Sequence, residues 1–283
     1  MRWMVGVDAR DLSGGAVALA RWLATGRLNA IYGVHVVEWV PELHEHFDQT
    51  RPNEIRQMAA DSLRSLEDDP HFEELGAVLA ASAEIGLAEA VATKQAHALI
   101  MGRRAPTTGG GLIRLGRVAR RMLRQLPVPV VVVPPDLSAD QLGPGPVVLG
   151  VDLTESCGPA AAFAARVATA MRRSLVLVHA IHPPDRGPYV PADVWDQIMA
   201  RLHGNDDPSF RTWADRHGVG AAERLERRGP PTLVLPTVAR EQRACMLVTG
   251  SRDLSGMERL FLSSVGSELA ATAPVPVAVV PPR

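Results

Sequence analysis

The chain repeats itself, and this repeat constrains its fold more than any other feature of the sequence. Four blocks recur in the same order. The first is "MVGVDARDLSGGAVALARWLA" (4–24), repeated as "VLGVDLTESCGPAAAFAARVA" (148–168), and the second is "AIYGVHVV" (30–37), repeated as "SLVLVHAI" (174–181). The third is "AHALIMGRR" (96–104), repeated as "ACMLVTGSR" (244–252), and the fourth is "LPVPVVVVPP" (126–135), repeated as "APVPVAVVPP" (273–282). The offsets of 144 to 148 positions make the 283 residues two copies of one unit.

The boundary between the copies is marked by composition. The stretch "DLSADQLGPGP" that ends at Pro146 is rich in glycine, proline and polar residues, which is typical of a connection. We therefore predict a first domain at 1–138, a linker at 139–146 and a second domain at 147–283.

Each copy alternates apolar runs with helical patterns. Near-continuous apolar runs such as "VPVVVV" indicate strands that are buried on both faces of a parallel sheet. Expected strands lie at about 4–8, 30–37, 77–82, 98–101 and 128–133, and at 147–151, 174–180, 222–226, 245–249 and 276–280; expected helices of the first copy lie at 14–25, 53–67, 86–96 and 116–125. The prediction is an α/β fold with two tandem open doubly wound parallel five-stranded sheets and helices on both faces.

Composition excludes several classes of protein. Apolar residues make up 46% of the chain and the net charge is −1, so we expect a globular protein that is no general binder of nucleic acid or membrane surfaces. The two cysteines, Cys157 and Cys245, supply neither a disulfide framework nor a set of zinc ligands. Because no basic start precedes a long apolar run, we expect no signal peptide, no membrane span and a cytoplasmic location.

The repeated blocks resemble a tandem member of the universal stress protein family. The resemblance rests on the opening strand that ends in Asp, the "VHVV" strand and the "GSR…SSVGSELAATAPVPVAVV" ending of the second copy. It implies an open five-stranded α/β fold. It also implies ATP binding in many members through a G-x2-G-x9-G-[ST] pattern, whose glycines let phosphates approach a helix N-terminus. Members without the pattern are expected not to bind ATP.

In the second copy this phosphate pattern is incomplete. Gly250 matches the first glycine and is followed by Ser251, whereas Asp253 replaces the second glycine. Ser263 stands at the third glycine, and Ser264 keeps its type. A carboxylate beside a phosphate would repel it by roughly 4 kcal/mol at ~4 Å and an effective dielectric of 20. A loop and helix cap without a ligand is the alternative here.

In the first copy the backbone frame is kept but arginines surround it. Gly102 matches the first glycine, Ala105 replaces the second, and Gly116 supplies the third one residue late. Arg117 stands where Ser or Thr is expected, and Arg103 follows Gly102 directly. One reading is an anion site in which Arg103, Arg104 and Arg117 bind a phosphate bidentately. The other is a solvated helix face whose arginine stems cover apolar surface.

Two further pairs of positions recur at the predicted ligand crevice. Asp8 and Asp152 end the first strands, where open α/β sheets bind ligands, and the resemblance places them near the adenosine part of a nucleotide. The alternative is that each caps the following turn. Val37 and its counterpart Ile181 correspond to the adenine-contacting position of the family, with plain core as the alternative. The repeated His35 and His179 are expected to be hydrogen-bonded core or crevice histidines.

These residues support a binding protein rather than an enzyme. No repeated Ser/His/Asp or paired-carboxylate arrangement is visible. The first reading is a non-catalytic stress-response or signalling protein that binds ATP, another adenine nucleotide or a phosphate-type anion, with the first domain filled before the second. The alternatives are a family member that acts through dimerisation and partner contacts without nucleotide, and a slow ATPase. No metal, nucleic acid or membrane partner is expected, and no cofactor is required.

The last strand of each copy predicts how the copies join. The strands at 128–133 and 276–280 are apolar and come last, so they are expected at a sheet edge, where an unpaired strand invites pairing. In the family the matching strand commonly pairs antiparallel across a dimer. We therefore expect an internal pseudo-dimer through these strands, and a homodimer of whole chains is left open.

Overall fold

The computed structural model describes residues 1–8, 14–26, 28–39, 51–103, 115–125, 127–142, 144–182, 191, 193–194, 208–251 and 265–282. The strands are β1 (Arg2–Gly6), β2 (Ala30–Glu38), β3 (Glu74–Ala80), β4 (Ala98–Gly102), β5 (Val130–Val133), β6 (Val147–Val151), β7 (Leu175–Ile181), β8 (Glu223–Arg228), β9 (Met246–Gly250) and β10 (Val277–Val280). The helices are α1 (Gly14–Ala24), α2 (Arg51–Asp61), α3 (Arg64–Glu67), α4 (Ala83–Thr93), α5 (Arg117–Gln125), α6 (Gly158–Met171), α8 (Pro208–Arg216), α9 (Pro231–Glu241) and α11 (Val265–Thr272), with short 3₁₀ turns η2 (Ala139–Gln141) and η3 (Glu155–Cys157). The α/β prediction is confirmed.

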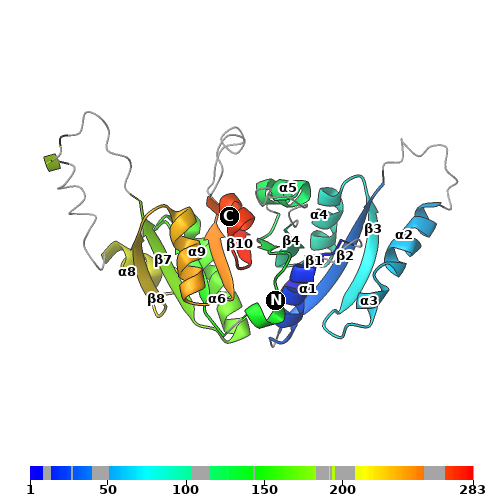
Figure 1. Cartoon of the computed structure of the whole chain (residues 1–283), viewed down its shortest axis with the longest axis horizontal. Coiled ribbons are helices and arrows are strands. Elements are labelled where there is room, and N and C mark those ends of the chain that lie inside the picture. Colours follow the sequence, from blue (N-terminus) through cyan, green and yellow to red (C-terminus); the bar gives the residue numbers. More distant parts are fainter. Residues whose placement is uncertain are drawn as a thin grey trace.

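All these strands form one ten-stranded sheet in the order β3-β2-β1-β4-β5-β10-β9-β6-β7-β8 (Figure 1). Each half is the expected five-stranded parallel sheet. The halves meet at the antiparallel pair β5 and β10, with Val277 opposite Val132 and Val279 opposite Val130. The expected pairing of the final strands is confirmed, and it joins the two predicted sheets into one. A homodimer of whole chains stays a prediction.

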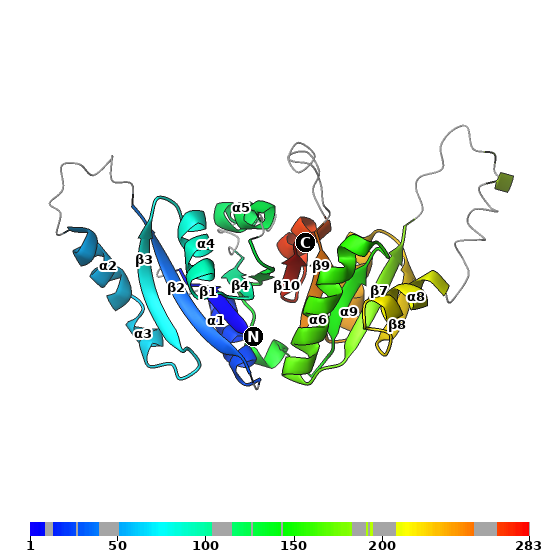
Figure 2. The same cartoon turned by 180° about the vertical axis from the view of Figure 1, so that it is seen from behind.

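Each face of the sheet carries one hydrophobic core, and both cores draw on both repeats. On one face α1 and α6 contribute to the same core, and on the other face lie α4, α5, α11 and α9 (Figures 1 and 2). Trp3 of β1 meets Phe163 of α6 edge to face, with ring centroids 6.0 Å apart. Because helices cover both faces, the central strands are buried on both sides, which explains their unbroken apolar sequences.

Several elements are displaced from their predicted ranges by two or three residues, among them β1, expected at 4–8, and α4, expected at 86–96. Two of the differences have a visible cause. The helix expected at 53–67 is interrupted between Asp61 and Arg64, where the Ser62 hydroxyl donates to the Met58 carbonyl and Leu63 turns into the core at 2% exposure. The strand expected at 77–82 runs at Glu74–Ala80, because its whole length pairs in register with β2 from Tyr32 to Glu38.

The stretch predicted as a linker is packed against the protein. Leu137 and Leu142 flank the η2 turn and are both buried in the core that contains α1 and α6. A Cβ added at Gly145 would lie 1.8 Å from the Arg243 carbonyl oxygen, so only glycine allows the chain to pass there. No described helix combines the length and the hydrophobicity that a bilayer-spanning segment needs.

Candidate functional site

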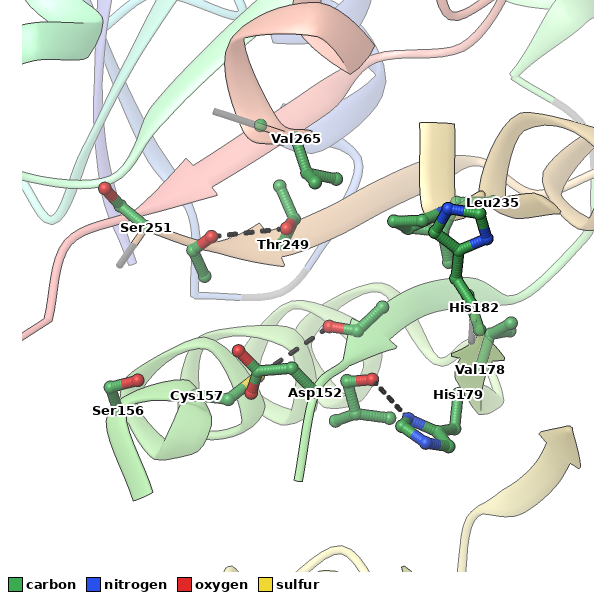
Figure 3. Close-up of a pocket in the computed structure, with 16 residues that line it drawn as sticks. Asp152, Ser156, Cys157, Val178, His179, His182, Leu235, Thr249, Ser251 and Val265 are labelled. Carbon is green, nitrogen blue, oxygen red and sulfur yellow. Dashed lines mark hydrogen bonds between the residues drawn. The ribbon is translucent and has the colours of Figure 1, made fainter. Parts of the chain in front are cut away.

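A pocket of about 390 Å³ opens at the carboxyl ends of β6, β7 and β9 in the second repeat (Figure 3). Its lining comes from the end of β6 and η3 (Gly150, Val151, Asp152, Ser156, Cys157), from β7 and the residue after it (Val178, His179, Ala180, His182), from α9 (Pro231, Leu235), from the end of β9 (Thr249, Gly250, Ser251) and from α11 (Val265, Gly266). Strand order reverses beside β6, since β7 lies on one side and β9 on the other. This is the switch point at which open α/β sheets bind ligands.

Asp152 is the acidic residue among those that line the pocket. Its Oδ1 accepts hydrogen bonds from the Thr154 backbone N–H at 3.1 Å and from the Thr154 hydroxyl at 2.7 Å. The expected role as a turn cap is therefore confirmed. Both bonds fall on Oδ1, and within the described part of the chain no hydrogen bond reaches Oδ2. Asp152 thus combines a fixed backbone position with an acceptor that is available to a ligand.

The repeated histidines share one arrangement. The ring Nδ1 of His179 lies 2.9 Å from the Val151 carbonyl, and that of His35 lies 2.8 Å from the Val7 carbonyl. Since a carbonyl only accepts, each Nδ1 carries the proton and donates. The expectation of hydrogen-bonded crevice histidines is confirmed. Each ring thereby connects the second strand of its repeat, β2 or β7, to the end of the first strand, β1 or β6.

The far wall of the pocket is formed by β9, α9 and α11. Figure 3 shows Asp152 and Ser156 on one side of the pocket, with Thr249, Ser251 and Val265 on the other. The Ser251 N–H donates to the Val280 carbonyl at 2.7 Å, which anchors the start of the loop after Gly250. Ser263 and Ser264, expected to complete the phosphate pattern, lie outside the described residues.

Arg103 of the first repeat is placed away from the anion site expected for it. It is 7% exposed, and its Nη1 donates to the carbonyls of Ala271 at 2.9 Å and Ala273 at 3.1 Å. These carbonyls lie at the C-terminal end of α11, so the guanidinium of a first-repeat residue contacts a helix of the second repeat. Burial lowers the pKa of this guanidinium, and nearby Asp136 opposes the shift.

The arginines of α5 also have partners in the protein. Arg117 donates to Glu38 at 3.3 Å, Arg121 donates to the buried Glu84 at 3.2 Å, and Arg120 donates to the Leu115 carbonyl. The Arg117 side chain is 65% exposed, in keeping with the solvated-face alternative. Arg104 lies outside the described residues. These described arginines of the first repeat are thus engaged within the protein, and the order in which the two repeats would be filled stays a prediction.

The other predicted residues of the first repeat hold their expected backbone positions. Gly102 ends β4, and Asp8 follows β1 on the surface. The Gly116 carbonyl accepts the Arg120 N–H at 3.0 Å, so Gly116 opens α5 as a helix cap would. Val37 lies in β2 opposite Leu79 of β3.

The universal stress protein family model matches the chain twice, over residues 1–134 and 145–281. The chain belongs to the universal stress protein family. Because the two matched segments carry β1–β5 and β6–β10, each half of the ten-stranded sheet is one copy of the family fold.

Individual members of the family support this assignment. A universal stress protein of Mycolicibacterium smegmatis is 30% identical over 194 residues, which cover 68% of this chain and 64% of that protein, so the match spans less than two thirds of the relative. A universal stress protein of Archaeoglobus fulgidus aligns over 99% of this chain and 98% of its own, with 16% identity and a TM-score of 0.64. A Pseudomonas aeruginosa protein of unknown function aligns over 99% of this chain and 92% of its own, with 16% identity and a TM-score of 0.67. The two structures support the fold alone.

Sequence reasoning placed the family's base-contacting position one residue away from the wall of the pocket. Ile181, the counterpart of Val37, is not among the lining residues, whereas Ala180 and His182 on either side of it are. Successive residues of a strand face opposite sides of the sheet, so the side chain of Ile181 lies on the other side from those of Ala180 and His182. A base-contacting role for Ile181 stays a prediction. The alternation of Val178, Ala180 and His182 was the signal that could have found this wall.

The two cysteines of this universal stress protein are expected to react slowly with thiol reagents at pH 8. Burial raises the pKa of Cys157 to about 12, with the Asp152 carboxylate adding to the shift, and raises the pKa of Cys245 to about 11. Relative to a pKa of 9.0, the thiolate fractions fall about thousandfold and about hundredfold. Ellman's reagent should label both thiols slowly in the native chain, at rates that can be measured over long incubation, and rapidly in guanidinium chloride. Rapid labelling of native Cys157 would show that it is an activated thiol.

Proposed function

We propose that this chain is a non-catalytic member of the family that binds an adenine nucleotide in the pocket of the second repeat. The observation that carries the proposal is Asp152, held at the end of β6 inside a cavity at the switch point of the sheet. Family membership and the pocket volume, within the range of small-molecule sites, support it.

The lining suits the separate parts of a nucleotide. Val178, Leu235 and Val265 offer apolar surface to a base, and the Oδ2 of Asp152 offers an acceptor to ribose hydroxyls. Gly250 and Ser251 end β9 beside the N-terminal end of α11, the kind of position that favours a phosphate. Among the described lining residues Asp152 is the acidic side chain, and a carboxylate repels phosphate groups. The pocket therefore suits a nucleotide with few phosphates better than one with many.

Turnover of the nucleotide is not part of the proposal. The Cys157 thiol faces the Gly150 carbonyl at 3.7 Å, and its raised pKa leaves it protonated. The His179 Nδ1 donates to the Val151 carbonyl. Across the described residues no group of His, Cys, Asp or Glu could hold a metal ion. The described lining residues therefore include no activated nucleophile, and we propose binding without chemistry on that basis.

The Asp152→Asn variant is expected to bind AMP about 10- to 100-fold more weakly than the wild type, the range for one hydrogen bond to a charged group. Asparagine keeps an oxygen for the Thr154 bonds, but its amide NH₂ replaces the acceptor at Oδ2. Calorimetric titration of AMP and ATP into both proteins measures the loss.

The internal repeat supplies the control, because Asp8 occupies the position of Asp152 in the first repeat. The Asp8→Asn variant should bind AMP as the wild type does. Loss of binding in Asp8→Asn alone would move the site to the first repeat. If the wild type binds neither AMP nor ATP, the proposal fails. The alternative, a family member that acts through protein partners without a nucleotide, then replaces it.

A further inference from the structure

Arg103 links the first repeat to a helix of the second. It follows β4 directly, and its backbone N–H donates to the Val133 carbonyl at 2.7 Å. Its buried guanidinium donates to Ala271 and Ala273, at the C-terminal end of α11. The last carbonyls of a helix have no partner within the helix, and a cation there is favoured by the helix dipole. A side chain of the first repeat thus caps the C-terminal end of a helix of the second repeat.

The opposite end of the same helix lines the pocket. Val265 and Gly266 begin α11 and belong to the pocket wall. A Cβ added at Gly266 would lie 3.0 Å from a methyl group of Val279, so the first turn rests closely on β10. The helix is only eight residues long. Fixing its C-terminal end therefore constrains where its first turn stands, because packed helices move as units.

Among the described residues, the equivalent position of the second repeat makes no such link. Ser251 holds the position of Arg103 in the second repeat, where its side chain lines the pocket. In the first repeat the same position carries a side chain long enough to reach α11. The buried Nε of Arg103 has no hydrogen-bond partner within the described part of the chain. An unpartnered buried donor is unfavourable, so the two bonds of Nη1 and the surrounding packing outweigh its cost.

We propose that Arg103 is a positioning residue of the second-repeat pocket, which it controls from the first repeat by holding the C-terminal end of α11. The link makes the pocket sensitive to any change around the end of β4. The proposal rests on the proposed function for the identity of the ligand, but the position of the pocket wall can be measured without one.

The test compares three single variants with the wild type. Arg103→Met keeps an unbranched apolar stem and removes the donors, whereas Arg103→Lys keeps a cation that can donate to the same carbonyls. Arg117→Met removes an exposed arginine of the same repeat whose partner, Glu38, is also on the surface. The readout is the labelling rate of Cys157, which lines the pocket, against that of Cys245, which lies at 0% exposure outside the pocket lining.

Arg103→Met should raise the labelling rate of Cys157 at least about tenfold while that of Cys245 stays unchanged, since the variant loses both charge-assisted hydrogen bonds of Nη1 and each is worth about that factor. Arg103→Lys and Arg117→Met should label as the wild type does. An equal rise at both cysteines would mean general destabilisation and would overturn the proposal, as would an unchanged rate at Cys157.

A parallel titration with AMP separates the two proposals. If AMP binds the wild type, its affinity should fall in Arg103→Met and recover in Arg103→Lys. If AMP binds no protein of the set, the proposed function fails while the cysteine rates still decide the role of Arg103. If AMP binds and the Cys157 rate does not respond, the role of Arg103 fails alone.

Discussion

Replacing Trp3 with alanine is expected to destabilise the whole chain by about 3–5 kcal/mol, the range for truncating a large buried aromatic side chain. Trp3 is fully buried at 0% exposure, and its indole N–H donates to Asn29 at 3.2 Å. Its ring meets Phe163 of the second repeat. The variant therefore loses core contacts on both sides of the repeat boundary and leaves the amide oxygen of Asn29 without this donor.

Urea unfolding monitored by circular dichroism measures the loss for Trp3→Ala. Because the two hydrophobic cores each contain residues of both repeats, we expect one transition at a lower midpoint with an unchanged slope. Trp22→Ala is the matched control, since that partly exposed ring packs at the margin of the same core and should cost less. Two separate transitions in Trp3→Ala, with one half unaffected, would show that the repeats hold their folds independently.

The repeat and the succession of strands and helices along each copy were readable from the sequence, because buried parallel strands leave unbroken apolar runs. "VPVVVV" predicted β5, and its place at the end of the copy predicted the pairing with β10. The role of Asp152 as a turn cap also follows from a local rule, since Asp favours turns after a strand.

The role of Arg103 could not be predicted in this way. The motif alignment placed it beside a phosphate because it considered one repeat at a time. Only the antiparallel pairing of β5 with β10 brings α11 of the second repeat within reach of the end of β4. A sequence motif that describes a single copy does not predict contacts that depend on how the two copies join.

Gly15→Ala and Gly14→Ala are expected to change stability in opposite directions, although the residues are adjacent at the start of α1. A Cβ at Gly15 would lie 1.9 Å from the Pro134 carbonyl oxygen, and 3.1 Å from its carbon. Since backbone atoms must then move, we expect a loss of about 1–3 kcal/mol or more. A Cβ at Gly14 meets nothing closer than 4.0 Å.

Helix propensity alone predicts a gain for both variants, because alanine is favoured over glycine in a helix by up to about 1 kcal/mol. Gly14→Ala should show this gain, whereas Gly15→Ala should show the clash, since α1 can lie against the segment after β5 only where a side chain is absent. Thermal and urea unfolding of the two variants beside the wild type measure the difference. Equal stability of the two variants would mean that α1 shifts without cost, and that the close contact with Pro134 does not fix its position on the sheet.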